Sequence, residues 1–201
     1  MIKLPRGGNS SYKRLIFFAT KNVNKFNEVR RILAEYHISV AMVKVKTLEV
    51  QDDDIEVIAK ISAINASQET NLPVVVEDAG LFIEALNGFP GPYSSYVYRT
   101  IGLNGILKLL EGIENRKAYF KSMVVFCDPK REIKCFQGVV YGQISMEAKG
   151  GGGFGFDPIF KPDEEPTKTF GEMSVEEKNK FSHRAKAFRR FAEWYRMTYS
   201  L

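Results

Sequence analysis

Apolar residues recur along the chain with two different periods, which predict strands and helices in alternation. Short, almost wholly apolar runs at residues 14–20, 38–45 and 73–78 are typical of strands buried inside a sheet. Helical spacing of apolar residues predicts helices at 22–36 and 55–70, between these runs. The first part of the chain therefore alternates strand and helix, the arrangement from which α/β folds are built.

The pattern changes after the third strand. Residues 81–86 are expected to continue extended until Asn87-Gly88 turns the chain, and residues 89–94 to form a constrained loop. A third helix is predicted at 102–113. This region therefore separates the strand–helix repeat from the rest of the chain.

The last third of the chain predicts a hairpin followed by helices. Residues 118–128 and 132–145 are two long strands on either side of a turn. Ser174 and Glu177 fit an S-x-x-E capping box that starts a short helix, and a longer helix begins near Ser182. The fold class predicted from these elements is α/β with a mixed sheet.

Composition sets limits on the location and the partners of the protein. The 201-residue chain carries a net charge of +5, which suits a polyphosphate or nucleic-acid partner. No apolar run approaches the roughly 20 residues that span a bilayer, and the start lacks the apolar stretch of a signal peptide, so we expect a cytoplasmic protein. Cys127 and Cys135 flank the hairpin turn and are expected to be free thiols. With only His37 and His183 to join them, the chain has almost no supply of ligands for a zinc site.

The segment GGGFGFDPIF at residues 151–160 has two interpretations. Its glycines let another group approach the main chain closely, and its aromatics could receive a flat ligand. Alternatively, the segment is a bulge or strand exchange whose phenylalanines only join the core. The local sequence does not decide between the two.

Polar side chains follow the strands at three places. The first strand enters its helix through Thr20, Asn22 and Lys25, where helix N–H groups and an ammonium suit an anion, although Asn22 could be only a cap. Glu49 follows the second strand and Asp78 ends the third, and carboxylates at strand ends suit Mg²⁺.

A third group of polar residues lies at the junction of the two last helices, in EMSVEEKNKFSHR. Lys178 and Arg184 can recognise oxygen acceptors, and His183 can read a base edge. A lone histidine near an apolar helix is more often structural. These residues become informative only together with the other two groups.

Four segments, taken in order, resemble the inosine triphosphate pyrophosphatase family: ATKNVNK (19–25), VEDAGLFIEALNGFPGPYSSYV (76–97), GFGFDPIF (153–160) and GEMSVEEKNKFSHRAKAF (171–188). The resemblance runs from about Leu15 to the end of the chain. It implies an elongated mixed α/β fold with flanking helices and two lobes around a nucleotide-binding cleft. Residues 14–201 would form one such domain, preceded by a mobile extension at residues 1–13.

The resemblance also implies an activity. Family members use Mg²⁺ to hydrolyse ITP, dITP and XTP to the monophosphate and pyrophosphate, cleansing the nucleotide pool, and they form homodimers without a nucleic-acid or membrane partner. Asp78 falls at the position of the general base, and Glu49 and Asp78 fall at metal-binding positions. The matched substrate-binding positions are Thr20, Lys21, Asn22, Val23, Asn24, Lys25, Ala79, Phe154, Gly155, Phe156, Asp157, Lys178, His183 and Arg184.

Two details of the match and two alternatives remain. Ala79 stands where many relatives have serine, so a hydroxyl contact would be lost there while a backbone N–H contact could survive. Lys60 matches the phosphate site less securely, because its helix agrees in type and not in motif. A related pyrophosphatase for modified pyrimidine nucleotides is one alternative. A basic nucleic-acid-binding module that uses aromatic stacking is the other, but it leaves the carboxylates at the strand ends unexplained.

Overall fold

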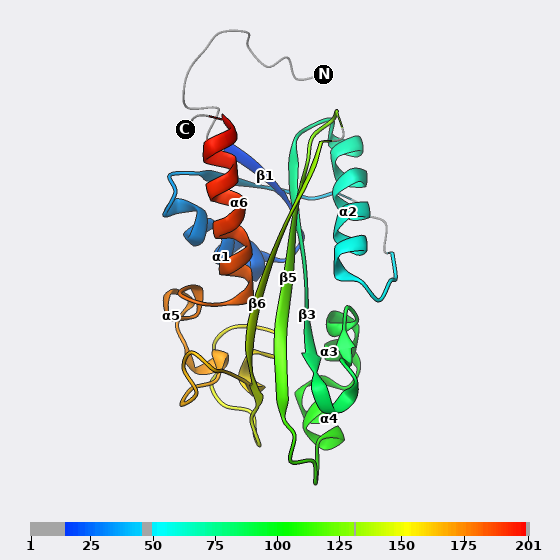
Figure 1. Cartoon of the computed structure of the whole chain (residues 1–201), viewed down its shortest axis with the longest axis vertical. Helices are drawn as coiled ribbons and strands as arrows, with labels where there is room; N and C mark the ends of the chain where they lie inside the picture. Colours follow the sequence, from blue (N-terminus) through cyan, green and yellow to red (C-terminus); the bar gives the residue numbers. More distant parts are fainter. Residues whose placement is uncertain (1–14, 46–49, 131, 200–201) are drawn as a thin grey trace.

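The protein is described by a computed structural model that covers residues 15–45, 50–130 and 132–199. It is elongated, with a central sheet that has helices α1 and α6 on one side and α2 on the other (Figure 1). The expected mixed α/β fold is confirmed. The expected extension at residues 1–13 lies outside the described residues. Within the described ranges, no helix is long and apolar enough to cross a membrane.

The sheet has seven strands and combines parallel and antiparallel pairing. Six follow the order β2-β1-β3-β5-β6-β7, and β4 pairs with β3. Strand β1 is parallel to β2 and β3, whereas the pairs from β3 to β7 are antiparallel. The strands are β1 (Leu15–Ala19), β2 (Ser39–Val43), β3 (Val74–Ile83), β4 (Pro90–Gly91), β5 (Lys117–Cys127), β6 (Ile133–Ile144) and β7 (Phe160–Pro162).

The helices largely follow the predicted periodicity. Asn22 caps the first helix and Asp54 caps the second, each through its side chain. The capping box of Ser174 and Glu177 is present, with both reciprocal hydrogen bonds. The α-helices are α1 (Val23–Ala34), α2 (Ile55–Thr70), α3 (Ser94–Thr100), α4 (Gly102–Leu109), α5 (Val175–Asn179) and α6 (His183–Tyr199), with short 3-10 turns at Glu84–Leu86, Asp157–Ile159 and Phe170–Glu172.

The middle of the chain differs from the prediction in three details. Strand β3 ends at Ile83 and a 3-10 turn follows, so residues 84–86 are not extended, although Asn87 and Gly88 do turn the chain with positive φ. Helix α3 directly follows the constrained loop and was missed, because its seven residues are too few to show a clear helical period. Helix α4 also ends four residues earlier than predicted, at Leu109.

Side-chain alternation along β5 separates two cores on opposite faces of the sheet. Val124 and Phe126 pack with helices α1 and α6. Met123 and Val125 pack with α2. A third core, around Phe120, fills the half of the molecule that contains α4 and β7. In the hairpin, Cys127 lies opposite Ile133 and not opposite Cys135, and no disulfide joins the two cysteines, as predicted.

Strand β3 changes its neighbour halfway along, and this change positions the site. Its first half pairs with β1 up to Val75, and its second half pairs with β4 from Leu81 onward. Among the described residues, the edge of β3 between these points has no partner strand. Ligands of α/β proteins bind where neighbouring strands diverge in this way, beyond the carboxyl end of a strand. Asp78, predicted to end the third strand, and the preceding acid Glu77 lie on this open segment.

Candidate active site

The loop between β1 and α1 is fixed by its own polar groups. The Asn22 N–H donates to Thr20 Oγ1 at 3.1 Å, and Asn22 Oδ1 accepts from the Lys25 N–H at 3.0 Å. Asn22 is therefore a helix cap, as the sequence allowed. The side chains of the intervening predicted positions Lys21, Val23 and Asn24 are exposed. Their backbone groups, at the N-terminus of a 12-residue helix, are the part of the loop suited to an anion.

Lys25 connects this loop to Glu77 on β3. Its Nζ lies 2.9 Å from Glu77 Oε2 and donates to the Glu77 carbonyl oxygen at 3.3 Å. The Glu77 side chain is fully buried, and it also accepts from Ser122 Oγ at 2.7 Å and from Arg184 Nε at 3.1 Å. Burial alone would raise the pKa of Glu77, but the charges of Arg184 and Lys25 outweigh it and lower the pKa.

Glu28 is a second buried acid, one turn after Lys25 on α1. It accepts from Arg184 Nη1 at 2.6 Å and from Lys178 Nζ at 2.9 Å. Burial would raise its pKa, but the two cations lower it on balance. Arg184 is thus held between Glu28 and Glu77, with only 2% of its surface exposed.

The glycine loop contributes a third buried acid and an aromatic ring. Asp157 Oδ2 accepts from the Phe154 N–H at 2.8 Å and lies 2.6 Å from Lys178 Nζ. Lys178 Nζ lies 5.0 Å from the centre of the Phe154 ring, and Arg184 Cζ lies 5.4 Å from it. Phe154 and Gly155 are partly exposed, whereas Phe156 is 3% exposed and belongs to the core. The core interpretation therefore holds for Phe156, whereas Phe154 keeps an exposed surface on which the ligand interpretation can still rest.

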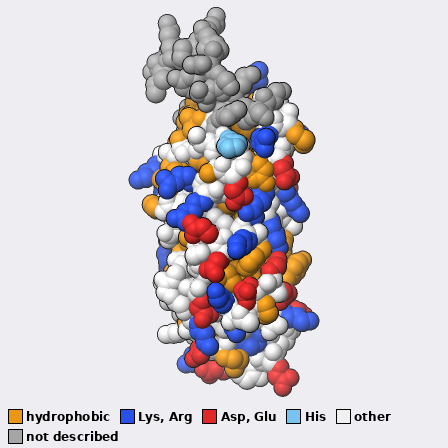
Figure 2. All heavy atoms as spheres, turned by 90° about the vertical axis from the view of Figure 1, so that its left-hand side faces the viewer, with side chains coloured by type: hydrophobic (Ala, Val, Ile, Leu, Met, Phe, Trp, Pro, Cys, Tyr) orange, Lys and Arg blue, Asp and Glu red, His pale blue; other side chains and the backbone are white. Residues whose placement is uncertain are grey.

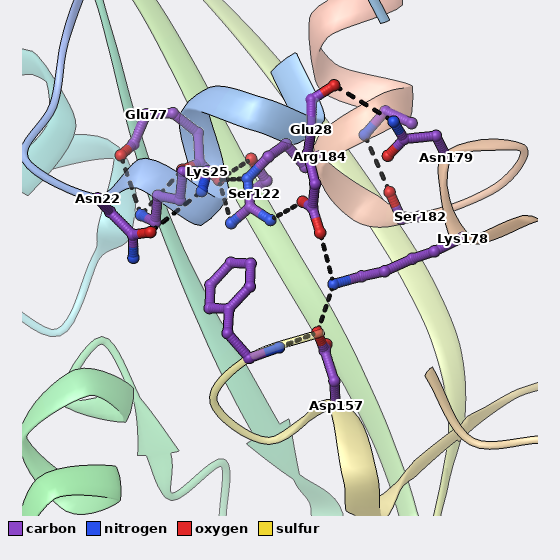
Figure 3. A network of polar contacts seen from close by, with 12 residues as sticks. Asn22, Lys25, Glu28, Glu77, Ser122, Asp157, Lys178, Asn179, Ser182 and Arg184 are labelled. Carbon is purple, nitrogen blue, oxygen red and sulfur yellow. Dashed lines mark hydrogen bonds and ion pairs between the residues drawn. The ribbon is translucent and has the colours of Figure 1, made fainter. Parts of the chain in front are cut away.

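Three cations and three carboxylates therefore form one network that joins α1, β3, the glycine loop, α5 and α6 (Figure 3). A buried charge is tolerated only when it is paired and hydrogen-bonded. The three carboxylates match Lys25, Lys178 and Arg184 in number. In this structure the charges of these cations are already neutralised by the protein.

His183 lies in the first turn of α6 beside this network. Its ring stacks on Phe120, with the ring centres 4.7 Å apart, and it is 2% exposed. Burial and the nearby charges of Arg184 and Lys178 lower its pKa well below 6.5, so the imidazole is neutral at pH 7. Among the described residues, its Nδ1 has no hydrogen-bond partner.

Asp78 follows Glu77 on β3 and therefore points to the opposite face of the sheet, the face of α2. It is partly exposed, and its Oδ1 accepts from the Ala79 N–H at 3.0 Å. Burial is the main cause that raises the pKa of Asp78, and the negative charge of Glu77 adds to it. Ala79, partly exposed, returns to the face of Glu77.

The metal-binding prediction involved Glu49 and Asp78. Glu49 lies outside the described residues, so only Asp78 can be placed. Within the described ranges, no group of three or more His, Cys, Asp or Glu side chains is arranged to hold a metal ion. A single carboxylate at an open strand edge nevertheless fits Mg²⁺, which is usually bound by one or two carboxylates together with substrate phosphates.

The structure adds Glu28, Glu77 and Ser122 to the predicted set. A signal for Glu28 was present in the sequence, since this acid lies beside Val29 on the face of α1 that Ile32 and Leu33 bury. An acid among buried helix positions requires a partner. Ser122 carried no such signal, because a single serine in an apolar strand is common.

Comparisons with known proteins agree with the resemblance in the sequence. Residues 16–194 match the sequence model of the Ham1 family. A dITP/XTP pyrophosphatase of Methanopyrus kandleri is 54% identical over 181 residues, which cover 90% of this chain and 96% of that protein. A dITP/XTP pyrophosphatase of Hyperthermus butylicus is 49% identical over 183 residues, covering 91% and 95%.

Solved structures share the fold. The Ham1 protein of Staphylococcus aureus matches with a TM-score of 0.78 at 27% identity, over 92% of this chain and 99% of that chain. A Mycobacterium abscessus protein described as a nucleoside-triphosphatase / dITP/XTP pyrophosphatase matches with a TM-score of 0.69 at 30% identity, over 88% and 98%. The similarity therefore extends over both halves of the elongated molecule.

Proposed function

The chain belongs to the Ham1 family, and from this premise we propose that it hydrolyses the non-standard purine nucleoside triphosphates ITP, dITP and XTP to the monophosphate and pyrophosphate. The observation that carries this proposal is the 54% identity, over 96% of its length, to a protein named dITP/XTP pyrophosphatase. The cleft at the open edge of β3 is where the reaction would occur.

We assign the two ends of the nucleotide to two parts of this cleft. The β1–α1 loop and Asp78 suit the triphosphate, because helix N–H groups and the positive end of the helix dipole attract anions. The partly exposed Phe154 suits the base, since an aromatic ring held by its neighbours offers a stacking surface. Asp78 would orient the attacking water and accept its proton. Its raised pKa makes it a better proton acceptor than an ordinary aspartate.

Mg²⁺ is part of this proposal. Asp78, together with Glu49 and the phosphate oxygens, would hold the ion. When bound, it would neutralise negative charge that builds on the departing pyrophosphate. Lys25 would act beside it, provided that the nucleotide competes with Glu77 for the ammonium group.

Base discrimination is assigned to His183 and Arg184. Hypoxanthine and xanthine carry an oxygen at C6, which accepts a hydrogen bond, whereas adenine carries an amino group there. The neutral imidazole of His183 has an Nδ1 without a partner among the described residues, and so retains hydrogen-bonding capacity. A site built to bond one group rejects an analogue that lacks it by up to about 10⁴-fold.

We also propose that the enzyme is a homodimer that acts in the cytoplasm. Of the eleven large hydrophobic side chains that are exposed among the described residues, six lie between residues 89 and 109, around α3 and α4. Such clustering is typical of a protein interface. The cytoplasmic location follows from the substrates, which arise in the pool of nucleotides used for nucleic-acid synthesis.

The arrangement of surface charge favours an enzyme over a nucleic-acid-binding module. On the face of the molecule that carries α1, α5 and α6, acidic and basic side chains are interspersed over the visible described surface (Figure 2). Binding to a nucleic-acid backbone requires a continuous basic patch or stripe. Three of the most buried cations are instead paired with carboxylates in the cleft.

A substrate panel tests the proposed function. Pyrophosphate release would be measured with ITP, dITP, XTP, ATP, GTP and a modified pyrimidine triphosphate, with and without Mg²⁺. We expect kcat/KM for ITP and XTP to exceed that for ATP by about 10²-fold or more, and no release without Mg²⁺. Comparable values for ATP and ITP would contradict base discrimination. Preference for the pyrimidine, or salt-sensitive oligonucleotide binding without any pyrophosphate release, would favour the corresponding alternative.

A further inference from the structure

Lys121 lies on the same face of the sheet as Asp78. It is on β5 opposite Gly80, while Asp78 on β3 lies opposite Met123 two residues away. Side chains two residues apart on adjacent strands share a face, and their Cβ atoms lie about 7–8 Å from each other. A lysine side chain can cover that distance. Lys121 therefore belongs to the half of the cleft that we assign to the triphosphate.

The ammonium group of Lys121 has no close partner among the described residues. Its side chain is partly buried, with 24% of its surface exposed, and its ion pair with Asp54 is a long one, 3.8 Å from Nζ to Oδ1. That oxygen already caps α2 by accepting from the Glu56 N–H at 2.9 Å. No hydrogen bond from Lys121 Nζ is present within the described part of the chain. Among the described side chains, only this long contact therefore opposes a move of the ammonium group toward a ligand.

Four other cations near the site are already paired with carboxylates of the chain. Lys25, Lys178 and Arg184 contact buried carboxylates at 2.6–3.1 Å. Lys60 on α2 contacts Glu56 at 2.6 Å. A triphosphate brings several negative charges into a partly desolvated site, and these charges need partners that are not already neutralised. Lys121 meets this requirement better than these four cations, and it is less exposed than Lys21 in the β1–α1 loop.

We infer that Lys121 is a further substrate-binding residue, whose ammonium group contacts the phosphates that leave as pyrophosphate. This inference rests on the proposed function. It places a cation on the Asp78 side of β3, away from the base-binding side that carries Phe154 and Arg184. Nucleotide binding would draw Lys121 from its long contact with Asp54 to a charge-assisted hydrogen bond with phosphate.

The experiment compares Lys121→Met with Lys117→Met. Lys117 lies on the same strand and the same face, four residues away, and is exposed, so its replacement controls for the loss of one positive charge. The measurements are KM and kcat for ITP, and inhibition of the reaction by inorganic pyrophosphate and by IMP. For Lys121→Met we expect KM for ITP and the inhibition constant for pyrophosphate to rise about tenfold or more, the scale of one charged hydrogen bond. The inhibition constant for IMP should stay within about twofold of the parent value. Lys121→Arg should restore most of the lost affinity for ITP and pyrophosphate. Lys117→Met should change neither KM for ITP nor the inhibition constant for pyrophosphate.

Two results would overturn the inference. One is an unchanged inhibition constant for pyrophosphate in folded Lys121→Met protein. The other is an equal rise for pyrophosphate and IMP, which would indicate a general disturbance of the cleft. If the parent releases no pyrophosphate from ITP, the proposed function fails, but calorimetry with inorganic pyrophosphate and Mg²⁺ still tests Lys121. Tighter pyrophosphate binding by the parent than by Lys121→Met supports the contact, and equal binding contradicts it.

Discussion

Glu77 and Asp78 are adjacent acids with opposite electrostatic environments. Alternation along β3 sends Glu77 toward Lys25 and Arg184, and Asp78 toward the face of α2. The pKa of Glu77 is lowered, since its partners outweigh the cost of burial, whereas the pKa of Asp78 is raised mainly by burial. An acid whose pKa is lowered by folding stabilises the fold when it is ionised. An acid whose pKa is raised by folding destabilises the fold when it is ionised. The first acid is therefore suited to structure and the second to catalysis.

This contrast predicts opposite effects of two neighbouring substitutions at pH 7. Asp78→Asn should lower kcat by about 10² or more, the scale of a lost general base, with Tm unchanged or higher. Glu77→Gln should remove one partner of a buried ion pair, at a cost of about 3–5 kcal/mol, and so lower Tm by roughly 6–20 °C. ITP hydrolysis at saturating Mg²⁺ and thermal unfolding of both variants provide the measurements.

The pH dependence of stability checks the same argument. The contribution of ionised Glu77 to the free energy of unfolding is fully present above the ordinary pKa of a glutamate, 4.5. This contribution is lost as the pH falls below that value. The Tm difference between the parent and Glu77→Gln should therefore narrow in acid.

Asp78→Asn protein that hydrolysed ITP within about threefold of the parent would exclude Asp78 as the catalytic carboxylate.

At the scale of elements, the glycine loop owes its shape to Gly153 and Asp157. Gly153 has φ of +70°, and a Cβ at this position would overlap Asp157 Oδ2. That oxygen accepts hydrogen bonds from both the Phe154 N–H and Lys178 Nζ. Gly151, two residues earlier, has no atom near the position of an added Cβ. The two glycines therefore differ in what they contribute, although both lie in one run of four glycines, residues 150–153.

Gly153→Ala should consequently disturb the base-binding part of the site, while Gly151→Ala serves as its matched control. We expect Gly153→Ala to cost about 1–3 kcal/mol of stability through backbone strain, and to raise KM for ITP about tenfold by moving Phe154. Gly151→Ala should leave Tm within about 2 °C and KM within about twofold of the parent. Steady-state kinetics and thermal unfolding measure both. Equal behaviour of the two variants would show that Asp157 does not organise this loop.

At the scale of the whole molecule, strands β3, β5 and β6 extend through both halves (Figure 1), and the charged network connects segments of the two halves. Lys178 bridges Glu28 on α1 and Asp157 in the glycine loop. A ligand that alters one of these contacts acts on both halves at once. The site thus brings together α1 and the glycine loop, which are about 130 residues apart in the sequence.

The proposed homodimer gives a prediction at this scale. Tyr96 on α3 is 62% exposed within the cluster of hydrophobic side chains between residues 89 and 109. Tyr96→Glu would place a charge inside that interface, so it should convert the dimer to a monomer in sedimentation velocity at micromolar concentration. Met197→Glu, on a side chain of α6 that is 78% exposed, should leave the dimer intact. A parent that sediments as a monomer would contradict the dimer, and a Tyr96→Glu dimer would place the interface elsewhere.

The sequence by itself determined most of the elements and the candidate residues. These elements are indicated by local signals: the periods of apolar residues, the caps at Asn22 and Ser174, and the turn at Asn87-Gly88. Such signals depend only on neighbouring residues, and the folded structure retains them. The four motifs also identified the family. Helix α3 was missed because seven residues provide too short a pattern.

Only the tertiary structure decided how the charged residues are paired. Periodicity indicates the face on which a side chain lies, but it does not select a partner about 150 residues away, as Lys178 and Arg184 are for Glu28. Periodicity also does not distinguish the role of Glu77 from that of Asp78, since both acids end the same apolar run. Their roles differ because folding places cations and a serine beside one acid and leaves the other at an open strand edge. Burial and charge pairing depend on all the segments that meet at a site, and therefore only the assembled fold determines them.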